Sequence, residues 1–147
     1  MKVRYAAQLF SSSVAKALRM LKNNNEPGFA DAKPTAQFLE MTDKLFDTLN
    51  GMSSYAKGYK RAVISFLQKA MSYILLLRDS AGVPLIRNNR IVVLRGFLIT
   101  IRSSIVLLTH LLKSDYYGVK LKFVCMYKFS QDHVELFFSV IRSRGGN

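Results

Sequence analysis

The sequence predicts an all-α protein, a helical bundle of about five helices. Apolar residues recur at helical spacing in five separate windows, and turn-forming Asn, Gly and Pro residues lie between the windows. Half of the 147 residues are hydrophobic and 12% are aromatic, enough to bury a core within one domain's length. A short segment at about 119–127 alternates apolar and basic residues, and there the pattern leaves a strand and an extended connection equally open.

The first predicted helix covers residues 3–23, and Pro34 suits the first turn of the second. Their apolar stripes consist of Val3, Ala7, Phe10, Val14, Leu18 and Leu21, and of Phe38, Leu39, Met41, Leu45, Phe46 and Leu49. Residues 23–28 end the first helix and open a loop that lasts to about Lys33. Asn50 and Gly51 end the second helix.

The third predicted helix covers about 58–79 and is followed by a break at 79–84. Its apolar stripe consists of Val63, Phe66, Leu67, Ala70, Met71, Ile74 and Leu77. The fourth helix, 91–113, is apolar on nearly all sides, so we expect it at the centre of the core. It contains Arg95, Arg102 and His110, which are costly inside a bilayer, and we therefore expect no membrane partner.

The last predicted helix covers about 131–144, because Ser130 suits an N-cap and two glycines follow residue 144. Val134, Phe137, Phe138 and Ile141 form its apolar face, and Asp132, Glu135, Ser139 and Arg142 form an adjoining polar edge. From spacing alone, two acids near a helix N-terminus complement the helix dipole more often than they bind a metal.

The composition indicates a polyanionic partner, because 22 Lys and Arg residues against 9 acids give a net charge of +13. Nucleic acid is the most common such partner, and the charge is spread along the chain instead of forming a tail. Cys125 is the single cysteine, which excludes an internal disulfide and a multi-cysteine zinc site. Neither His110 nor His133 has a second histidine at ligand spacing, so both are expected to be structural.

Residues 130–146 read Ser-Gln-Asp-His-x-Glu-Leu-Phe-Phe-Ser-x-Ile-Arg-Ser-Arg-Gly-Gly, which resembles the last catalytic helix of P-element-type transposases, including the THAP-domain group. Residues 2–18 and 38–50 are similar to the GTP-binding helical insertion domain of that family, and Gly96-Phe97-Leu98 also fits. The resemblance implies two parts. Residues 1–118 would form part of the insertion domain, and 119–147 would carry the catalytic-Glu helix of the RNase H-like domain.

By this resemblance, Glu135 is the third acid of a DDE site and a ligand of Mg²⁺. The residues that would face GTP are Lys2, Val3 and Ser11 from the first helix, Phe46, Asp47 and Asn50 from the end of the second, and Asp132. Lysine and serine suit phosphate or ribose, an aromatic ring can stack on a purine, and a carboxylate can accept from the guanine N1 and N2 hydrogens. Asp47 and Asp132 both remain candidates for that last role.

The patterns also allow plainer readings. Val3 and Phe46 fall in apolar stripes and could be core residues, and Asp47 and Asn50 could be capping residues at a helix end. Arg142 and Arg144 could contact a DNA backbone or simply be solvated.

The predicted function is that of a fragment of a P-element-like transposase, with GTP and transposon-end DNA as partners, a nuclear location and a homo-oligomer formed through parts outside this sequence. The family's first two catalytic acids precede the matched region, so we expect that the chain alone cannot cut or join DNA. Magnesium-dependent strand transfer by the purified chain would contradict this. The alternative is a non-catalytic basic helical module that binds nucleic acid or another partner.

Overall fold

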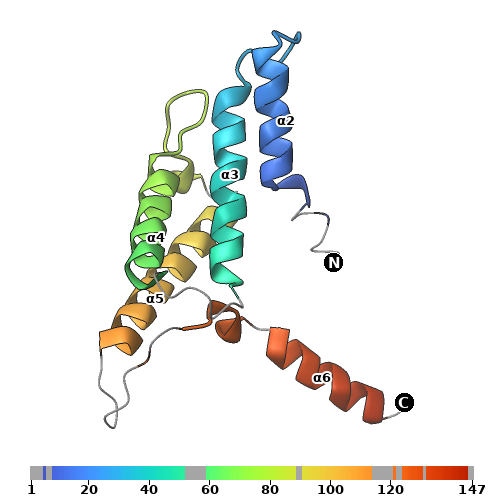
Figure 1. The fold of residues 1–147 in the computed structure, drawn as a ribbon, viewed down its shortest axis with the longest axis vertical. Helices are drawn as coiled ribbons and strands as arrows, with labels where there is room; N and C mark the ends of the chain where they lie inside the picture. Colours follow the sequence, from blue (N-terminus) through green and yellow to red (C-terminus); the bar gives the residue numbers. More distant parts are fainter. Residues whose placement is uncertain are drawn as a thin grey trace. The chain divides into compact units, whose positions relative to one another are not determined.

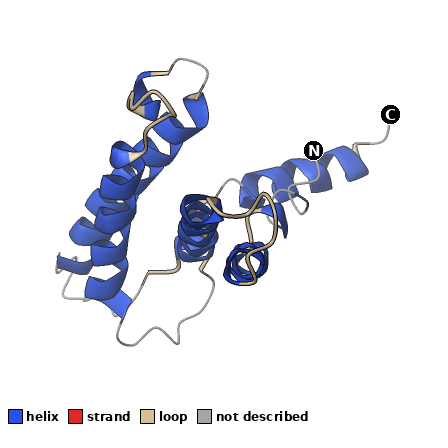
Figure 2. Cartoon of the chain, turned by 90° about the horizontal axis from the view of Figure 1, so that it is seen from above, coloured by secondary structure: helices blue, strands red, loops and turns tan. Residues whose placement is uncertain are grey.

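The computed structural model describes residues 5, 8–51, 59–88, 91–113, 121, 124–130 and 132–145, with side chains except at 59–62, 132 and 133. In these residues the elements are α2 (Ser12–Asn23), α3 (Ala32–Leu49), α4 (Tyr59–Leu76), the 3₁₀ turn η1 (Leu85–Arg87), α5 (Val92–Lys113), the 3₁₀ turn η2 (Met126–Phe129) and α6 (Asp132–Arg144) (Figure 1). The described part of the chain contains helices and loops but no strand (Figure 2), which confirms the all-α prediction.

The chain divides into two compact units, 1–48 and 49–147. The first unit is built on the α2–α3 hairpin. Ala15 and Ala36 are fully buried and Leu39 is nearly so, and Phe10, Val14 and Leu18 pack against them. Alanines at the contact let the two helix backbones approach closely, while the rings of Phe10 and Phe38 meet edge to face at a centroid distance of 6.2 Å.

An ion pair also joins α2 to α3 at the surface of the hairpin. Arg19 donates from Nε and Nη2 to the two carboxylate oxygens of Glu40, at 2.8 and 2.6 Å. Hydrogen bonding from Arg19 holds the pKa of the Glu40 carboxyl below its ordinary value, and the positive charges of Arg19 and Lys16 act in the same direction. Because both side chains remain more than a third exposed, solvent screens this pair.

The prediction of one uninterrupted helix over 3–23 is wrong at Ser11. Residues 5, 8 and 9 are helical, but Ser11 has an extended backbone with φ −89° and ψ 155°, and α2 starts after it. The Ser11 hydroxyl accepts a hydrogen bond from the Val14 amide at 3.4 Å. Serine side chains compete in this way for backbone donors, so a local cap interrupts a helix although the apolar spacing continues through it.

The predicted ends of α3 are confirmed. The helix starts at Ala32, which places Pro34 in its first turn, and it ends at Leu49, directly before Asn50 and Gly51. The loop before it turns through Asn25 and Gly28, both with positive φ angles of 55° and 84°.

In the second unit, α4 packs against α5. Leu67, Ala70 and Ile74 are the buried residues of α4, and Leu94, Ile101, Ser104 and Leu108 are those of α5. The connection begins where α4 ends at Leu76, three residues earlier than predicted. There Arg78 pairs with Pro84, and the Asp79 carboxylate accepts from the amides of Ala81 and Val83, both at 2.9 Å.

The prediction that α5 lies at the centre of the core is wrong. It exposes Val92, Val93, Ile99 and Val106, each between 62% and 69%. One stripe of α5 is buried and the opposite one faces solvent, because a two-helix hairpin covers each of its helices on one side only. α5 is also long and apolar enough, by length and composition, to cross a membrane, so the expected absence of a membrane partner stays a prediction.

The last helix is exposed along its described length. In α6 the apolar side chains that are between 47% and 63% exposed are Val134, Leu136, Phe137, Phe138, Val140 and Ile141. Ser130 has the extended backbone expected before a helix, but its buried hydroxyl oxygen has no hydrogen-bond partner among the described residues, so the predicted capping bond is not formed there. The Gly145 amide donates to the Ile141 carbonyl at 2.8 Å where α6 ends.

Candidate functional site

The predicted nucleotide residues that the structure describes most fully lie at the end of α3. Phe46 is 43% exposed, although its position in the apolar stripe made a core role the plainer reading. The Asp47 carboxylate is exposed and has no hydrogen bond or ion pair with the described part of the chain, so it does not cap the helix. Asn50 follows as a half-buried turn residue. An exposed aromatic ring and an unpaired acid therefore stand next to each other on one helix.

Ser11 belongs to the same unit but is not brought against this pair. Its neighbour Phe10 contacts Phe38, and Phe46 lies eight residues farther along α3, about 12 Å at 1.5 Å per residue. The Ser11 hydroxyl already accepts the α2 capping bond, which leaves its O–H available as a donor. Lys2 and Val3 lie outside the described residues, as does the side chain of Asp132, whose backbone begins α6.

The candidate catalytic residue Glu135 lies in the first turn of α6 and is exposed. Within the described residues, no group of three or more His, Cys, Asp or Glu side chains could hold a metal ion. The residues described therefore do not fit a complete Mg²⁺ site, and Glu135 contributes one carboxylate. Arg142 and Arg144 are exposed in the last turn of α6, and Arg142 follows Glu135 by seven residues, close to two helical turns, on the same side.

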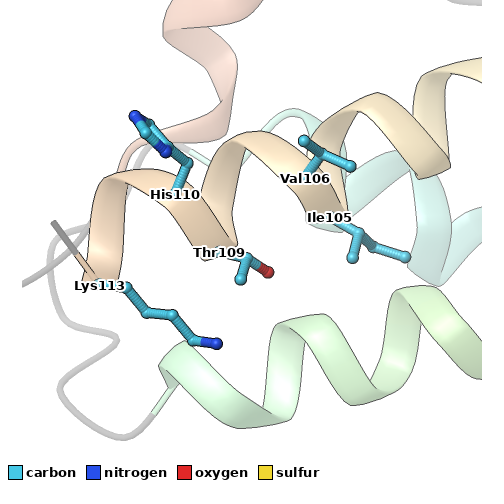
Figure 3. Close-up of a pocket in the computed structure, with 5 residues that line it drawn as sticks. All are labelled: Ile105, Val106, Thr109, His110 and Lys113. Carbon is cyan, nitrogen blue, oxygen red and sulfur yellow. The ribbon is translucent and has the colours of Figure 1, made fainter.

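A shallow depression of about 450 Å³ lies on α5, lined by Ile105, Val106, Thr109, His110 and Lys113. Figure 3 shows that these side chains fan out over one face of α5 and do not converge on one point: in this view Thr109 and Lys113 extend downward, and Val106 and His110 extend upward. None of the residues predicted from the sequence to bind GTP, metal or DNA lines this depression.

Sequence reasoning missed two features that bear on function. The Arg19–Glu40 pair joins two helices across 21 residues, and no spacing rule within one helix could have indicated it. The exposed face of α5 was missed because the composition of that helix is apolar all round. Its arginines, seven residues apart, were the available signal for a solvent-facing stripe.

Comparisons with known proteins match both ends of the chain. Residues 1–62 match the family model described as the TNP-like GTP-binding insertion domain. Residues 127–147 match the model of the TNP-like RNase H C-terminal domain. Ser11, Phe46, Asp47 and Asn50 lie in the first match, and Glu135, Arg142 and Arg144 lie in the second. The boundary predicted at 118/119 falls between the matches and remains a prediction.

The chain is also 31% identical, over 153 aligned residues, to a human protein described as DNA transposase THAP9. The alignment covers 97% of this chain and 16% of that relative's length. The chain therefore corresponds to a small part of the longer protein. No solved structure matches the chain.

Proposed function

The chain belongs to the P-element-like transposases, and from this premise we propose that its first unit binds the base of a guanine nucleotide at the end of α3. The observation that carries the proposal is the exposed Phe46–Asp47 pair, which lies inside the segment that matches the GTP-binding insertion domain. The Phe46 ring is 43% exposed and the Asp47 carboxylate has no partner among the described residues, so both groups are accessible to a ligand.

The chemistry of these side chains suits guanine. The Phe46 ring offers a stacking surface for a purine, and the Asp47 carboxylate can accept two hydrogen bonds from the N1 and N2 hydrogens of guanine. Adenine presents an acceptor at N1 and lacks the N2 amino group, so the same carboxylate would disfavour it. Asn50 can add an amide hydrogen bond, and Ser11 and Lys2 are the residues proposed to face ribose and phosphate.

Calorimetric titration of the whole chain with GTP and with ATP tests this proposal. We expect micromolar binding of GTP, weaker binding of ATP, and a loss of about tenfold or more in GTP affinity in Asp47→Ala, because one buried donor pair on the base would lose its acceptor. Asp31→Ala is the matched control, since Asp31 is also an exposed acid and lies in the loop before α3. Equal affinity for the two nucleotides, or equal effects of the two substitutions, would contradict guanine recognition by Asp47.

For the second match we propose that Glu135 is the third acid of a DDE site, with DNA in the nucleus as the substrate of the complete protein. Arg142 and Arg144 would contact the DNA backbone, because arginine neutralises phosphates irrespective of sequence. The described residues lack the further acids that a two-metal site requires, so the chain alone is expected to be inactive. Cleavage of a labelled duplex by the chain with Mg²⁺, abolished by Glu135→Gln, would show instead that Glu135 has all the partners it needs.

A second candidate function is that of a non-catalytic basic module. It is favoured by the charge of residues 49–147, which carry 15 of the 22 basic residues and 4 of the 9 acids. Absence of nucleotide binding together with retained binding of nucleic acid would favour this candidate over the first.

A further inference from the structure

The positive charge of the chain is unevenly divided. Residues 1–48 have a net charge of +2 and residues 49–147 a net charge of +11. The stretch 80–114, which includes α5, contains no Asp or Glu at all. Asp79, just before it, has its carboxylate committed to the backbone amides of its own turn. The cations of this stretch therefore have no acidic residue within the stretch itself.

Three of these cations lie along one side of α5. Arg95, Arg102 and Lys113 are all exposed, and they are separated by seven and eleven residues, close to two and three whole helical turns. They consequently form a nearly straight line of charge. The buried residues of α5, which are Leu94, Ile101, Ser104 and Leu108, lie on other sides of the helix.

A fourth cation, Arg87, lies close to Arg95, before the start of α5. The Arg95 side chain donates from Nε to the Ile86 carbonyl at 3.2 Å, which holds its guanidinium beside η1, where Arg87 is exposed. Arg87, Arg102 and Lys113 make no hydrogen bond or ion pair with the residues that the structure describes. We call Arg87, Arg95, Arg102 and Lys113 the α5 basic edge.

We propose that the α5 basic edge binds the sugar-phosphate backbone of a DNA duplex, independently of its base sequence. This rests on the proposed function in so far as DNA is the partner, and it adds a contact surface in a segment that neither family match covers. From Arg95 to Lys113 the edge extends about 27 Å. Each DNA strand places roughly eight phosphates over that length, so all four cations can reach phosphates of one duplex.

An anionic membrane surface is the competing occupant, because Ile99 and Val106 are exposed beside the cations. A helix that lies in a membrane interface separates an apolar face from a charged face. On α5 the exposed aliphatic residues and the cations share one side, so insertion of Ile99 would carry Arg95 and Arg102 with it at high cost. A second copy of the chain is disfavoured, because pairing this face with itself would bring like charges together.

The test measures binding of the whole chain to a fluorescein-labelled duplex of roughly 20 base pairs by fluorescence anisotropy over a range of salt concentrations. The variant Arg87→Gln/Arg102→Gln/Lys113→Gln removes the three cations that make no hydrogen bond or ion pair within the described residues. We expect it to bind more weakly and to lower the slope of log affinity against log salt by about 3, near 0.9 for each lost phosphate contact. The control Lys16→Gln/Lys22→Gln/Lys33→Gln removes equal charge from the first unit and should leave the slope unchanged.

Equal losses in the two triple variants would overturn the proposal, because net charge alone would then explain the binding. The proposal would also be overturned, in favour of a membrane surface, if the α5 variant lost binding to phosphatidylserine vesicles but bound DNA as tightly as the wild-type chain. Equal competition by polyglutamate and DNA would show a general polyanion surface, which also overturns it. If the triple variant fails to match the wild-type circular dichroism, Arg102→Gln alone should lower the slope by about 1. GTP titration of the same variant should be unchanged, which separates this proposal from the nucleotide proposal.

Discussion

The α2–α3 hairpin and α6 have the same kind of apolar sequence pattern, but the apolar face is buried in the hairpin and exposed in α6. Both have apolar residues at helical spacing and both lie in segments that match transposase family models. In the hairpin that face is covered: Ala15 and Ala36 are 0% exposed and Leu39 is 7% exposed. In α6 the equivalent residues Phe137 and Phe138 are 61% and 53% exposed. An apolar stripe thus predicts that a helix has a face to bury, and says nothing of where the covering surface comes from.

The difference has an energetic meaning. In the hairpin, α2 and α3 bury each other's apolar faces, so this burial stabilises the chain without any partner. The apolar side chains of α6 remain between 47% and 63% exposed in the described structure, and exposed apolar side chains favour association with other apolar surfaces. Three variants test this contrast.

The largest effect is expected for Leu39→Ala in the hairpin. Truncating a buried leucine loses its transfer free energy and leaves a cavity, which together should lower the free energy of unfolding by about 2 to 4 kcal/mol. Urea unfolding followed by circular dichroism measures this. Leu9→Ala is the matched control, because Leu9 is the same residue type in the same unit but is 62% exposed. Similar losses in the two variants would mean that the hairpin core does not carry the stability.

A smaller and pH-dependent effect is expected for Glu40→Gln, which breaks the ion pair with Arg19. The hydrogen bonds from Arg19 lower the pKa of Glu40 in the folded state relative to its ordinary value of 4.5. The stabilisation is therefore present above pH 4.5 and is lost as the pH falls through the lower, folded-state pKa. Wild type should exceed the variant in unfolding free energy at neutral pH, and the two should converge in acid. A constant difference across that range would mean that the pair contributes only through packing.

The smallest effect on stability is expected for Phe137→Ser/Phe138→Ser in α6. Since both rings are already exposed, the free energy of unfolding should change by less than about 0.5 kcal/mol. Binding of an apolar dye and self-association at high protein concentration should both fall, because the variant removes exposed apolar area. Phe10→Ser, which removes a ring packed on Phe38, should do the reverse: it should lower stability and leave dye binding unchanged. A large loss of stability in the α6 variant would show that this helix is packed after all.

Features with a local chemical cause were predictable from the sequence. The end of α3 at Asn50 and Gly51 and the length of α5 follow from turn residues and from helical spacing. The interruption at Ser11 was not predictable in the same way, because Phe10 and Val14 keep the apolar spacing across it and only the capping bond shows where the helix starts. The exposed side of α5 could not be predicted either, since the number of neighbours around a helix is a property of the tertiary fold.

For the candidate site as well, features within one helix could be predicted, and features that combine distant segments could not. Family resemblance indicated Phe46, Asp47 and Glu135, and the structure places all three on exposed positions of regular helices. A single helix can show that a carboxylate is accessible, as it does for Glu135. It cannot supply the other acids of a metal site, which come from distant segments, so the metal chemistry remains a proposal. The α5 basic edge was within reach of the sequence through the spacing of Arg95, Arg102 and Lys113.

The close packing of Ala15 against Ala36 sets the direction of α3, and so the position of Phe46 farther along that helix. Ala36 lies against Ala15 with no exposed surface, and Phe46 follows ten residues later, about 15 Å along the same helix. A larger side chain at Ala36 would push the two backbones apart and tilt α3. Over 15 Å, a tilt of about 5° displaces the Phe46 ring by roughly 1 Å, a shift that binding sites of defined geometry do not tolerate. A slightly larger side chain at Ala36 should therefore lower nucleotide affinity before it changes the overall helix content.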